Sequence, residues 1–204
     1  KYTSDLVIDT LWLFSKKEIL MKILVTGNLG YIGSVLVEKL IFNEDYVVGL
    51  DVGYYKDCIL TNCVEPQKQI IKDIRSIDEN DLNEIETIIH LAALSNDPLG
   101  ELMPGITSEI NYLSTISFAK MAKKKGVKRF IYISSQSMYG ISKLDKPLNE
   151  DDSEKNPITE YAKTKWSAEI ELKKLSDSNF VITFLRPATV FGASPRLRSD
   201  IVFN

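Results

Sequence analysis

The chain has 204 residues, of which 44% are hydrophobic and 26% are charged, and its 25 Lys and Arg residues against 28 Asp and Glu give a formal net charge of -3. This apolar content is enough for the core of one globular domain and excludes a disordered tail. The near balance of charges provides no overall attraction to nucleic acid or to an anionic membrane, so neither is expected as a partner.

Residues 1–20 precede the first clear strand and contain two short apolar runs, at 11–14 and 19–20. Polar and charged residues interrupt these runs far short of the roughly 20 apolar residues that span a bilayer. The segment also lacks the basic start, long apolar centre and cleavage site of a secretory signal. We therefore predict a non-catalytic extension at 1–20 and one domain at 21–204. The alternative is a surface helix or partner-docking segment that uses Leu11, Trp12 and Phe14.

Cysteine and histidine are scarce. The only cysteines, Cys58 and Cys63, have a spacing that fits neither a CxxC redox pair nor a zinc site. A reduced, cytoplasmic protein is the simplest interpretation, with a local disulfide as the alternative. His90 is the only histidine, which excludes a metal site built from several imidazoles, and no metal is expected. A structural or hydrogen-bonding role is favoured for His90 over a role as acid or base.

Short apolar runs alternate with helical patterns along the rest of the chain. Residues 22–26 predict a strand, 27–30 a glycine-containing turn and 31–42 a helix with one apolar face. A long helix is predicted around 110–121, because the lysines at 123–125 and Gly126 suit a helix C-terminus. The remaining predictions are strands at 46–50, 69–71, 87–91, 129–134 and 181–185, a loop at 143–157 and a helix at 160–175. This alternation indicates a parallel sheet covered on both faces, the doubly wound α/β architecture of the Rossmann fold.

Gly27, Gly30 and Gly33 lie three residues apart between the first strand and the first helix. In such a turn the first glycine permits a sharp bend, the second lets the backbone approach a pyrophosphate, and the third lets the helix pack on the strand. The N–H groups at the start of the helix, at Tyr31 and Ile32, and the partial positive charge there suit phosphates. The pattern predicts a dinucleotide site.

Acidic residues at two strand ends are candidates to complete this site. Asp51 ends the second strand 24 positions after Gly27, where a carboxylate can accept both hydroxyls of an adenosine ribose. A 2′-phosphate would meet like charge there, which favours NAD over NADP; an aspartate that caps a turn is the alternative. Asp73 and Ile74, after the third strand, are candidates to hold the adenine amino group or are simply turn residues.

Tyr161 and Lys165 are four residues apart on the predicted helix 160–175 and so lie on one face. A phenol with a pKa near 10 is a poor base at neutral pH, and a nearby ammonium that stabilises the phenolate makes it useful. Ser134 and Ser135 end a strand at the carboxyl edge of the sheet, where ligands bind in this architecture. A hydroxyl there is a candidate to hold a substrate oxygen, with a solvated helix face and a turn serine as the alternatives.

Six motifs occur in an order that resembles the extended short-chain dehydrogenase/reductase family, in its sugar-nucleotide epimerase and dehydratase branch. The motifs are 27–33, 90–93, Asn111, 133–135 with 138–140, 161–165 and 186–192. The resemblance implies NAD as the cofactor, Tyr161 as the proton-transfer base, Lys165 tuning it and binding the nicotinamide ribose, and Ser135 hydrogen-bonding the reacting hydroxyl. Asn111 would help to order the site. Leu91 is an implied cofactor contact, and Ala92, Ala93 and Pro187 would line the nicotinamide cleft.

The implied reaction begins when Tyr161 takes the proton of a sugar hydroxyl while hydride leaves that carbon for the nicotinamide, which gives a keto-sugar. Dehydratases of this branch have Thr-Asp-Glu where this chain has Ser135, Gln136 and Ser137. The missing acid pair favours epimerisation, similar to that of a UDP-glucose 4-epimerase. The alternatives are a dehydratase, a net NAD-dependent dehydrogenase or reductase, and a non-catalytic NAD-binding sensor.

The resemblance implies a smaller C-terminal part that grips the nucleotide sugar, and because this sequence ends at Asn204 we expect most of that part to lie outside it. Arg196 and Arg198 resemble its beginning, where they would meet a substrate diphosphate; ordinary solvated arginines are the alternative. The partners implied by the resemblance are a nucleotide-sugar substrate and a second copy of the chain in a homodimer.

Overall fold

Six parallel strands form a single sheet in the order β3-β2-β1-β4-β5-β6. The structure is a computed structural model that describes residues 21–95, 97–141 and 147–198, so the predictions for residues 1–20 lie outside it. The strands are β1 (Lys22–Thr26), β2 (Tyr46–Asp51), β3 (Lys68–Ile71), β4 (Thr87–His90), β5 (Arg129–Ile133) and β6 (Val181–Leu185). This strand order is that of the Rossmann fold, which confirms the predicted fold class.

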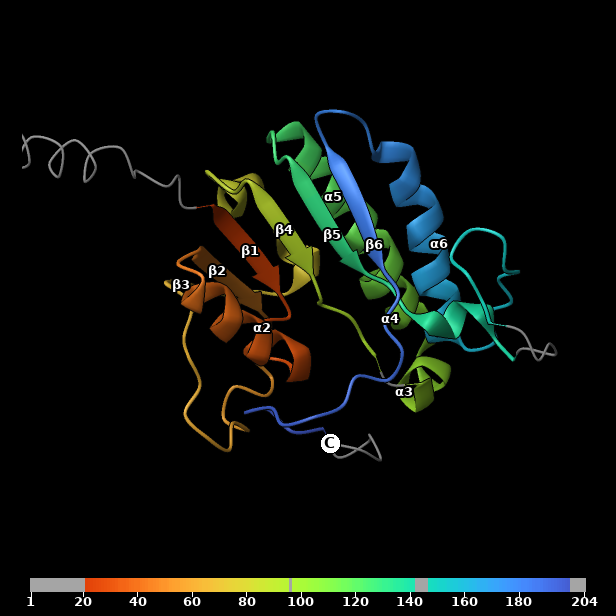
Figure 1. Cartoon of the computed structure of the whole chain (residues 1–204), viewed down its shortest axis with the longest axis horizontal. Coiled ribbons are helices and arrows are strands. Elements are labelled where there is room, and N and C mark those ends of the chain that lie inside the picture. Colours follow the sequence, from red (N-terminus) through yellow and green to blue (C-terminus); the bar gives the residue numbers. More distant parts are fainter. Residues whose placement is uncertain (1–20, 96, 142–146, 199–204) are drawn as a thin grey trace, which may run out of the picture.

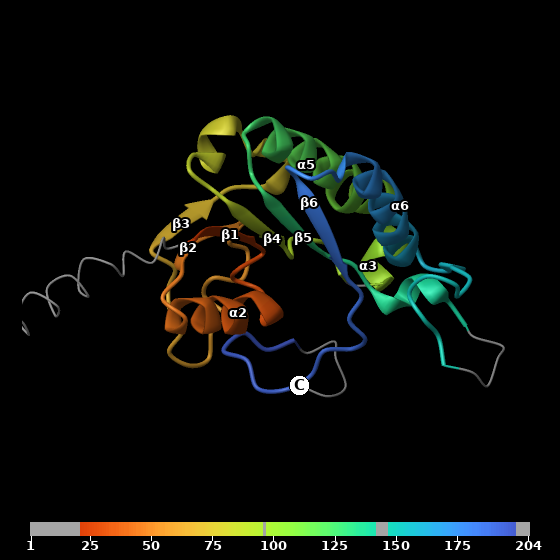
Figure 2. The same ribbon diagram turned by 45° about the horizontal axis from the view of Figure 1, so that its top comes forward.

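Helices lie on both faces of the sheet, as Figures 1 and 2 show. One face carries α2 (Tyr31–Phe42). The helices on the other face are α3 (Asp97–Leu102), α4 (Pro104–Ser108), α5 (Thr115–Lys124) and α6 (Glu160–Leu175). Short 3-10 turns occupy Ile74–Ser76, Glu79–Leu82 and Gln136–Tyr139. Because the strands are parallel, their carboxyl ends lie at one edge of the sheet, where the loops that carry the candidate site residues begin.

Two apolar layers hold the helices to the sheet. On the α5 and α6 side, Leu24, Phe118, Phe130 and Leu172 are fully buried in the larger layer. On the α2 side, the layer includes Val25 and Val37. The central strands β1 and β4 are buried almost throughout, as expected for parallel strands covered on both faces.

The long helix predicted around 110–121 is confirmed at its C-terminal end, where Lys123 and Lys124 occupy the last turn of α5 and Gly126 has a φ of 80°. Upstream, the structure adds α3, α4 and a π-helical turn at Glu109–Ser114 that periodicity did not predict. A π turn inserts a residue into the 3.6-residue repeat, so the apolar spacing at 110–121 predicted a helix there but not its π-helical first part.

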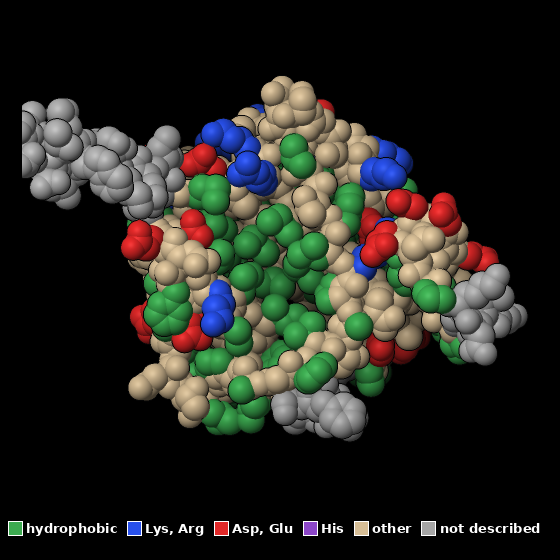
Figure 3. All heavy atoms as spheres, viewed as in Figure 1, with side chains coloured by type: hydrophobic (Ala, Val, Ile, Leu, Met, Phe, Trp, Pro, Cys, Tyr) green, Lys and Arg blue, Asp and Glu red, His purple; other side chains and the backbone are tan. Residues whose placement is uncertain are grey.

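The half of the sheet beyond α2 has apolar side chains that no helix covers within the described residues. Val181 and Leu185 of β6 are each 47% exposed and lie on the α2 side of the sheet. Figure 3 shows apolar side chains gathered over the middle of this face. The α2 side is therefore the less completely packed of the two.

Candidate active site

The glycine turn after β1 has the close contacts that its spacing predicts. Gly27 has a φ of 72° and donates its N–H to the carbonyl of Leu50 at 2.8 Å. A Cβ on Gly27 would lie 2.8 Å from the backbone nitrogen of Ala92, and one on Gly33 would lie 2.2 Å from the carbonyl oxygen of Gly27. Side chains at either position would push α2 and β4 away from the turn.

The N-terminus of α2 is left open toward this turn. Gly30 is the N-cap residue and makes no side-chain hydrogen bond to the first turn of the helix. Because the first N–H groups of a helix have no intrahelical partner, those of Tyr31, Ile32 and Gly33 can bind an anion such as a pyrophosphate. The Tyr31 side chain is engaged elsewhere, since its hydroxyl donates to the carbonyl of Gly192 at 2.6 Å. The cradle therefore fits a dinucleotide through its backbone.

Asp51 lies beside the glycine turn, as predicted. Its carboxylate accepts the N–H of Leu29 at 3.2 Å and that of Gly53 at 2.8 Å. Asp73 is engaged differently: it caps a 3-10 turn and pairs with Arg75 at 2.8 Å, whose hydrogen bond holds the pKa of Asp73 below its usual value. Ile74 is buried in the larger apolar layer. Asp51 is thus bonded to backbone N–H groups at the glycine turn, whereas Asp73 is paired with a cationic side chain.

Asn28, inside the glycine turn, is a residue that sequence reasoning missed. Its side chain is 2% exposed and pairs with the amide of Gln69 on β3, with Nδ2 donating at 2.8 Å and Oδ1 accepting at 3.2 Å. Gly49 of β2 makes room for this pair, since a Cβ there would lie 2.4 Å from Asn28 Nδ2. The pair anchors the turn to a strand 41 residues away, a distance that leaves no local signal.

The structure brings together Ser135, Tyr161 and Lys165. Tyr161 and Lys165 lie on one face of α6, with Lys165 Nζ 5.9 Å from the centre of the Tyr161 ring. Burial raises the pKa of Tyr161; a hydrogen bond with Ser135 opposes this, nearby Asp97 adds to it, and Arg198 lowers it. The phenol therefore has a hydroxyl partner and charged neighbours at the carboxyl edge of the sheet.

Lys165 is fully buried beneath the phenol. Its Nζ donates to the carbonyl of Ile133 at 2.8 Å and lies 4.9 Å from the centre of the Tyr132 ring. Burial lowers the pKa of Lys165 to about 7. At neutral pH this ammonium therefore lies near its titration midpoint.

Replacing Lys165 with Met is expected to stabilise the fold. The pKa falls from 10.5 to about 7 on folding, so between these values the unfolded chain binds more protons and the stability of the wild type rises with pH. Burying the Lys165 ammonium destabilises the wild type, and this destabilisation is fully present below about pH 7. There Lys165→Met should raise the unfolding free energy by on the order of a few kcal/mol. The gain should shrink toward about pH 10. Urea unfolding across this range measures it.

The matched control is Lys163→Met, an exposed lysine on the same helix. It should change the unfolding free energy by less than about 0.5 kcal/mol at any pH. A Lys165→Met variant that is no more stable than the wild type at about pH 6 would contradict the burial cost.

Asn111 lies in the π-helical turn and fastens the loop after β4 to α6. Its Oδ1 accepts the N–H of Leu94 at 2.8 Å, and its Nδ2 donates to the carbonyl of the same residue at 2.9 Å. Nδ2 also lies 3.5 Å from Oγ1 of Thr164, which in turn donates to the carbonyl of Tyr161 at 2.8 Å. The side chain thus links the π-helical turn to the loop after β4 and, through Thr164, to the backbone of Tyr161.

His90 is fully buried and serves a structural hydrogen-bond chain. The hydroxyl of Thr115 donates its proton to the carbonyl of Asn111, so Thr115 Oγ1 accepts from His90 Nε2 at 2.9 Å. The other ring nitrogen, Nδ1, accepts from the hydroxyl of Thr26 at 2.7 Å. Burial lowers the pKa of His90 to about 3, with a smaller contribution from Lys165. The neutral ring supports the structural interpretation over acid or base chemistry. Thr26 Oγ1 also accepts the N–H of Ala92, beside Leu91 and Ala93.

The segment after β6 returns to the site from its other side. Pro187 accepts the N–H of Gln136, directly after Ser135, at 3.1 Å. The Arg198 guanidinium donates to Oγ of Ser95 at 3.2 Å and influences Tyr161, as noted above. Arg196 instead stacks on the ring of Tyr55 at 4.3 Å. The two arginines paired in the sequence are therefore separated in the structure.

Residues 21–95, 97–141 and 147–198 contain no cluster of metal ligands, no disulfide and no membrane-spanning helix. No cluster of three or more His, Cys, Asp and Glu side chains there is arranged to hold a metal ion. Cys58 and Cys63 are free thiols. None of the helices described is long and apolar enough to cross a membrane.

The chain matches a family model and several curated proteins. The model of the NAD dependent epimerase/dehydratase family matches residues 23–202. The chain is 30% identical over 180 residues to UDP-glucose 4-epimerase of Vibrio cholerae, which covers 83% of this chain and 52% of that protein. It is 30% identical over 186 residues to dTDP-D-glucose 4,6-dehydratase of Mus musculus, which covers 84% and 51%. The chain spans about half the length of the curated relatives it matches.

A solved structure shares the fold over most of the chain. MoeE5 in complex with UDP-glucuronic acid and NAD superimposes with a TM-score of 0.75 and 28% sequence identity, over 88% of this chain and 58% of that one.

Proposed function

Because this chain belongs to the NAD-dependent epimerase/dehydratase family, we propose that it is the cofactor-binding and catalytic part of a sugar-nucleotide epimerase. The observation that carries the proposal is the meeting of Ser135, Tyr161 and Lys165 at the carboxyl edge of the sheet, the edge that also carries the glycine turn. A protein that only bound a dinucleotide would have no need for this trio. V. cholerae UDP-glucose 4-epimerase and MoeE5 with its bound UDP-glucuronic acid support a nucleotide sugar as the substrate.

NAD is held in this proposal by the backbone of the glycine turn and by strand-end residues. The open N–H groups of α2 take the pyrophosphate, and Asp51 accepts the adenosine ribose hydroxyls in place of the N–H of Leu29. The other proposed contacts are Asp73, Ile74, Leu91, Ala92, Ala93, Asn111, Tyr161, Lys165 and Pro187. Bound there, NAD supplies the hydride acceptor.

Tyr161 is the proposed base. It takes the proton of a sugar hydroxyl that Ser135 holds by a hydrogen bond, and the sugar carbon that loses hydride becomes a ketone. Rotation of the keto-sugar before hydride returns inverts that carbon. The buried ammonium of Lys165 stabilises the phenolate, because opposite charges attract more strongly away from water.

Epimerisation is favoured over dehydration by the residues after Ser135. Elimination of water requires an acid and a base near the leaving hydroxyl. Gln136 and Ser137 carry no carboxylate, and the Ser137 hydroxyl accepts a hydrogen bond from Ser135 at 3.0 Å. The dehydratase relative keeps dehydration as the second candidate. The homodimer stays a prediction from the resemblance.

The full-length protein should be incubated with NAD and a panel of UDP-, GDP-, CDP- and dTDP-sugars, with product stereochemistry and NADH absorbance followed together. We expect an inverted sugar and no accumulation of NADH. Stoichiometric NADH would replace the proposal with a net dehydrogenase, and a keto-deoxy sugar would replace it with a dehydratase. Tight NAD binding without any turnover on the panel would count against an enzyme of this class.

A further inference from the structure

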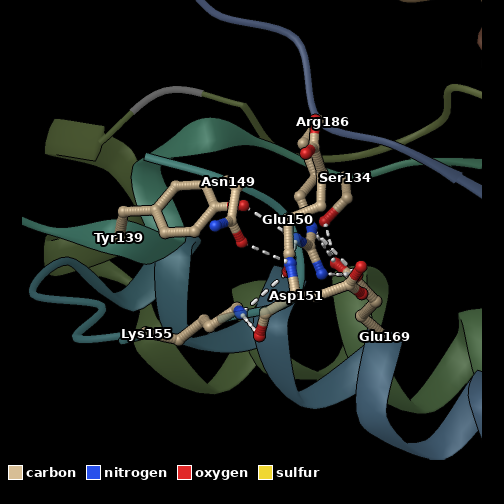
Figure 4. A network of polar contacts seen from close by, with 8 residues as sticks. All are labelled: Ser134, Tyr139, Asn149, Glu150, Asp151, Lys155, Glu169 and Arg186. Carbon is tan, nitrogen blue, oxygen red and sulfur yellow. Dashed lines mark hydrogen bonds and ion pairs between the residues drawn. The ribbon is translucent and has the colours of Figure 1, made fainter. Parts of the chain in front are cut away.

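A buried ion pair joins the helix that carries Tyr161 to the end of the last strand. Glu169 of α6 is 4% exposed, and its carboxylate accepts hydrogen bonds from Nε of Arg186 at 3.0 Å and from Oγ of Ser134 at 2.8 Å. Figure 4 shows both donors converging on this carboxylate. The end of β5, the end of β6 and the middle of α6 thus meet at one side chain.

The other side of the Arg186 guanidinium fastens two further segments. Its Nη1 donates to the hydroxyl of Tyr139 at 2.7 Å and to the carbonyl of Glu150 at 2.7 Å. Lys155 donates to the same carbonyl at 2.8 Å. The turn that follows Ser135 and the loop that leads into α6 are therefore tied to the same arginine, as Figure 4 shows.

When the register of β5 and β6 is continued past the strand ends, Ser134 lies opposite Arg186 and Ser135 lies opposite Pro187. The N–H of Ser134 donates to the carbonyl of Leu185 at 2.7 Å, and the N–H of Gln136 donates to that of Pro187 at 3.1 Å. The backbone that carries the candidate hydroxyl is thus paired with the backbone that carries the guanidinium.

Glu169 also lies on the same face of α6 as Tyr161 and Lys165. It follows Lys165 by four residues and Tyr161 by eight, about one and two turns of helix. A rotation or slide of α6 that moved the phenol would therefore also move the carboxylate away from Ser134 and Arg186. A movement of α6 that changes the distance between Ser135 and Tyr161 would therefore also disturb the ion pair.

Stability alone is a poor reason for such a pair. Well-packed apolar side chains of similar volume often stabilise a core as much as a buried ion pair does, whereas directional, charge-assisted hydrogen bonds define one arrangement. Every bond described above links segments that carry or flank Ser135 or Tyr161. The geometry therefore favours a role in orientation.

We propose that Glu169 and Arg186 are positioning residues, which act through Ser134 to hold the Ser135 hydroxyl against the Tyr161 phenol. Neither residue touches the substrate in this proposal. The catalytic consequence depends on the proposed function of the trio, whereas the structural coupling between Ser134 and Tyr161 does not.

The test depends on the groups that face the phenol. These are Ser135 after β5, Asp97 from α3, Arg198 from the segment after β6, Lys165 from α6 itself and Tyr132 from β5. Of these, Ser135 directly follows Ser134, whose hydroxyl donates to Glu169 of the ion pair. Because its hydrogen bond lowers the pKa of Tyr161, loosening Ser135 should raise that pKa.

Ser134→Ala is the cleanest variant, because it removes the hydroxyl link and leaves the ion pair in place. We expect kcat to fall by roughly 10- to 100-fold while KM changes less than about 2-fold, the pattern of a misplaced reacting group. The acid limb of the kcat against pH profile should move to higher pH. Glu169→Gln should act in the same direction, and if its unpaired arginine prevents folding, Ser134→Ala still decides.

The matched control is Glu171→Gln, on the same helix but on the exposed side, where Glu171 pairs with Lys174. This variant removes one carboxylate charge from α6, as Glu169→Gln does, but Glu171 does not contact Ser134. Its kcat and its pH profile should therefore stay at wild-type values. A shift in this control equal to that of Ser134→Ala would overturn the proposal, because any loss of charge or helix stability would then be enough.

A double-mutant cycle tests the route of action. If Ser134 acts through Ser135, adding Ser134→Ala to Ser135→Ala should cost little further activity, because the group being positioned is gone. Fully additive losses would overturn the proposal. Thermal melting of each variant separates these outcomes from unfolding.

A readout without substrate separates this proposal from the proposed function. With ¹³Cζ-labelled tyrosine, the Tyr161 resonance is assigned by its absence in Tyr161→Phe, and its titration onset is followed in the full chain. We expect Ser134→Ala and Ser135→Ala both to move the onset to higher pH, and Glu171→Gln to leave it unchanged. An unmoved onset in a folded Ser134→Ala variant would overturn the positioning role even if the epimerase activity were established.

Discussion

Tyr161→Phe should lower kcat by about 10²- to 10⁴-fold, which is the usual contribution of a positioned proton-transfer group. The change removes only the phenol oxygen, and the ring, most of which is buried, keeps its packing beside Ser135 and Lys165. NAD affinity and the melting temperature should therefore stay close to those of the wild type. Steady-state epimerase assays, NAD titration by calorimetry and thermal melting measure the three quantities.

Tyr46→Phe provides a control for the loss of a tyrosine hydroxyl. Tyr46 begins β2 at the opposite edge of the sheet, where Lys22 lies 5.5 Å from the centre of its ring. Its kcat should match the wild type. Activity retained by Tyr161→Phe within a few-fold would remove Tyr161 from the role of base and point to another acceptor near Asp97.

Gly33→Ala should abolish NAD binding and destabilise the fold. The added methyl would lie 2.2 Å from the carbonyl oxygen of Gly27 and 2.6 Å from Cα of Asn28, and both are backbone atoms that cannot rotate aside. The N-terminus of α2 must then move away from the turn, which costs about 1–3 kcal/mol of overpacking and displaces the N–H groups that face the pyrophosphate. Thermal unfolding and NAD calorimetry on the same sample test both parts.

Gly105→Ala is the matched control. Gly105 lies in α4 with no atom within 4 Å of an added Cβ, so alanine there should be neutral or should stabilise the helix by about 0.5–1 kcal/mol. Wild-type NAD affinity in Gly33→Ala would show that the close approach at the turn is not required for the cofactor.

Local sequence was sufficient to predict those features that depend on one helix, strand or turn and on the residues at its ends. The glycine turn, α2 and α6 lie where spacing placed them, because backbone freedom at glycine and the 3.6-residue repeat are properties of short segments. The pairing of Tyr161 with Lys165 follows from helix geometry in the same way. The predicted strand ends at 91 and 134 are one residue too long, although the N–H groups of Leu91 and Ser134 still bond to the neighbouring strand ends.

Other site features depend on contacts between distant segments. Asn28 meets Gln69 across 41 residues, and Asn111 reaches Thr164 across 53. No local sequence pattern predicts the partner of either amide side chain, because the order of the strands and the π-helical turn determine which residues lie next to it. The same holds for Asp97 of α3 and Arg198 of the segment after β6, which both influence the pKa of Tyr161.

The sequence by itself determined the doubly wound fold, the family and the order of the motifs, because each rests on short-range periodicity and on residues that recur at set spacings. Only the tertiary structure decided how Ser135 and Tyr161 are held together. Ser134, Glu169 and Arg186 come from three elements, and their side chains meet only after β5 and β6 have paired and α6 has packed against them. A buried charge must find its partner in three dimensions, since the energy that stabilises the pair exists only where water has been excluded.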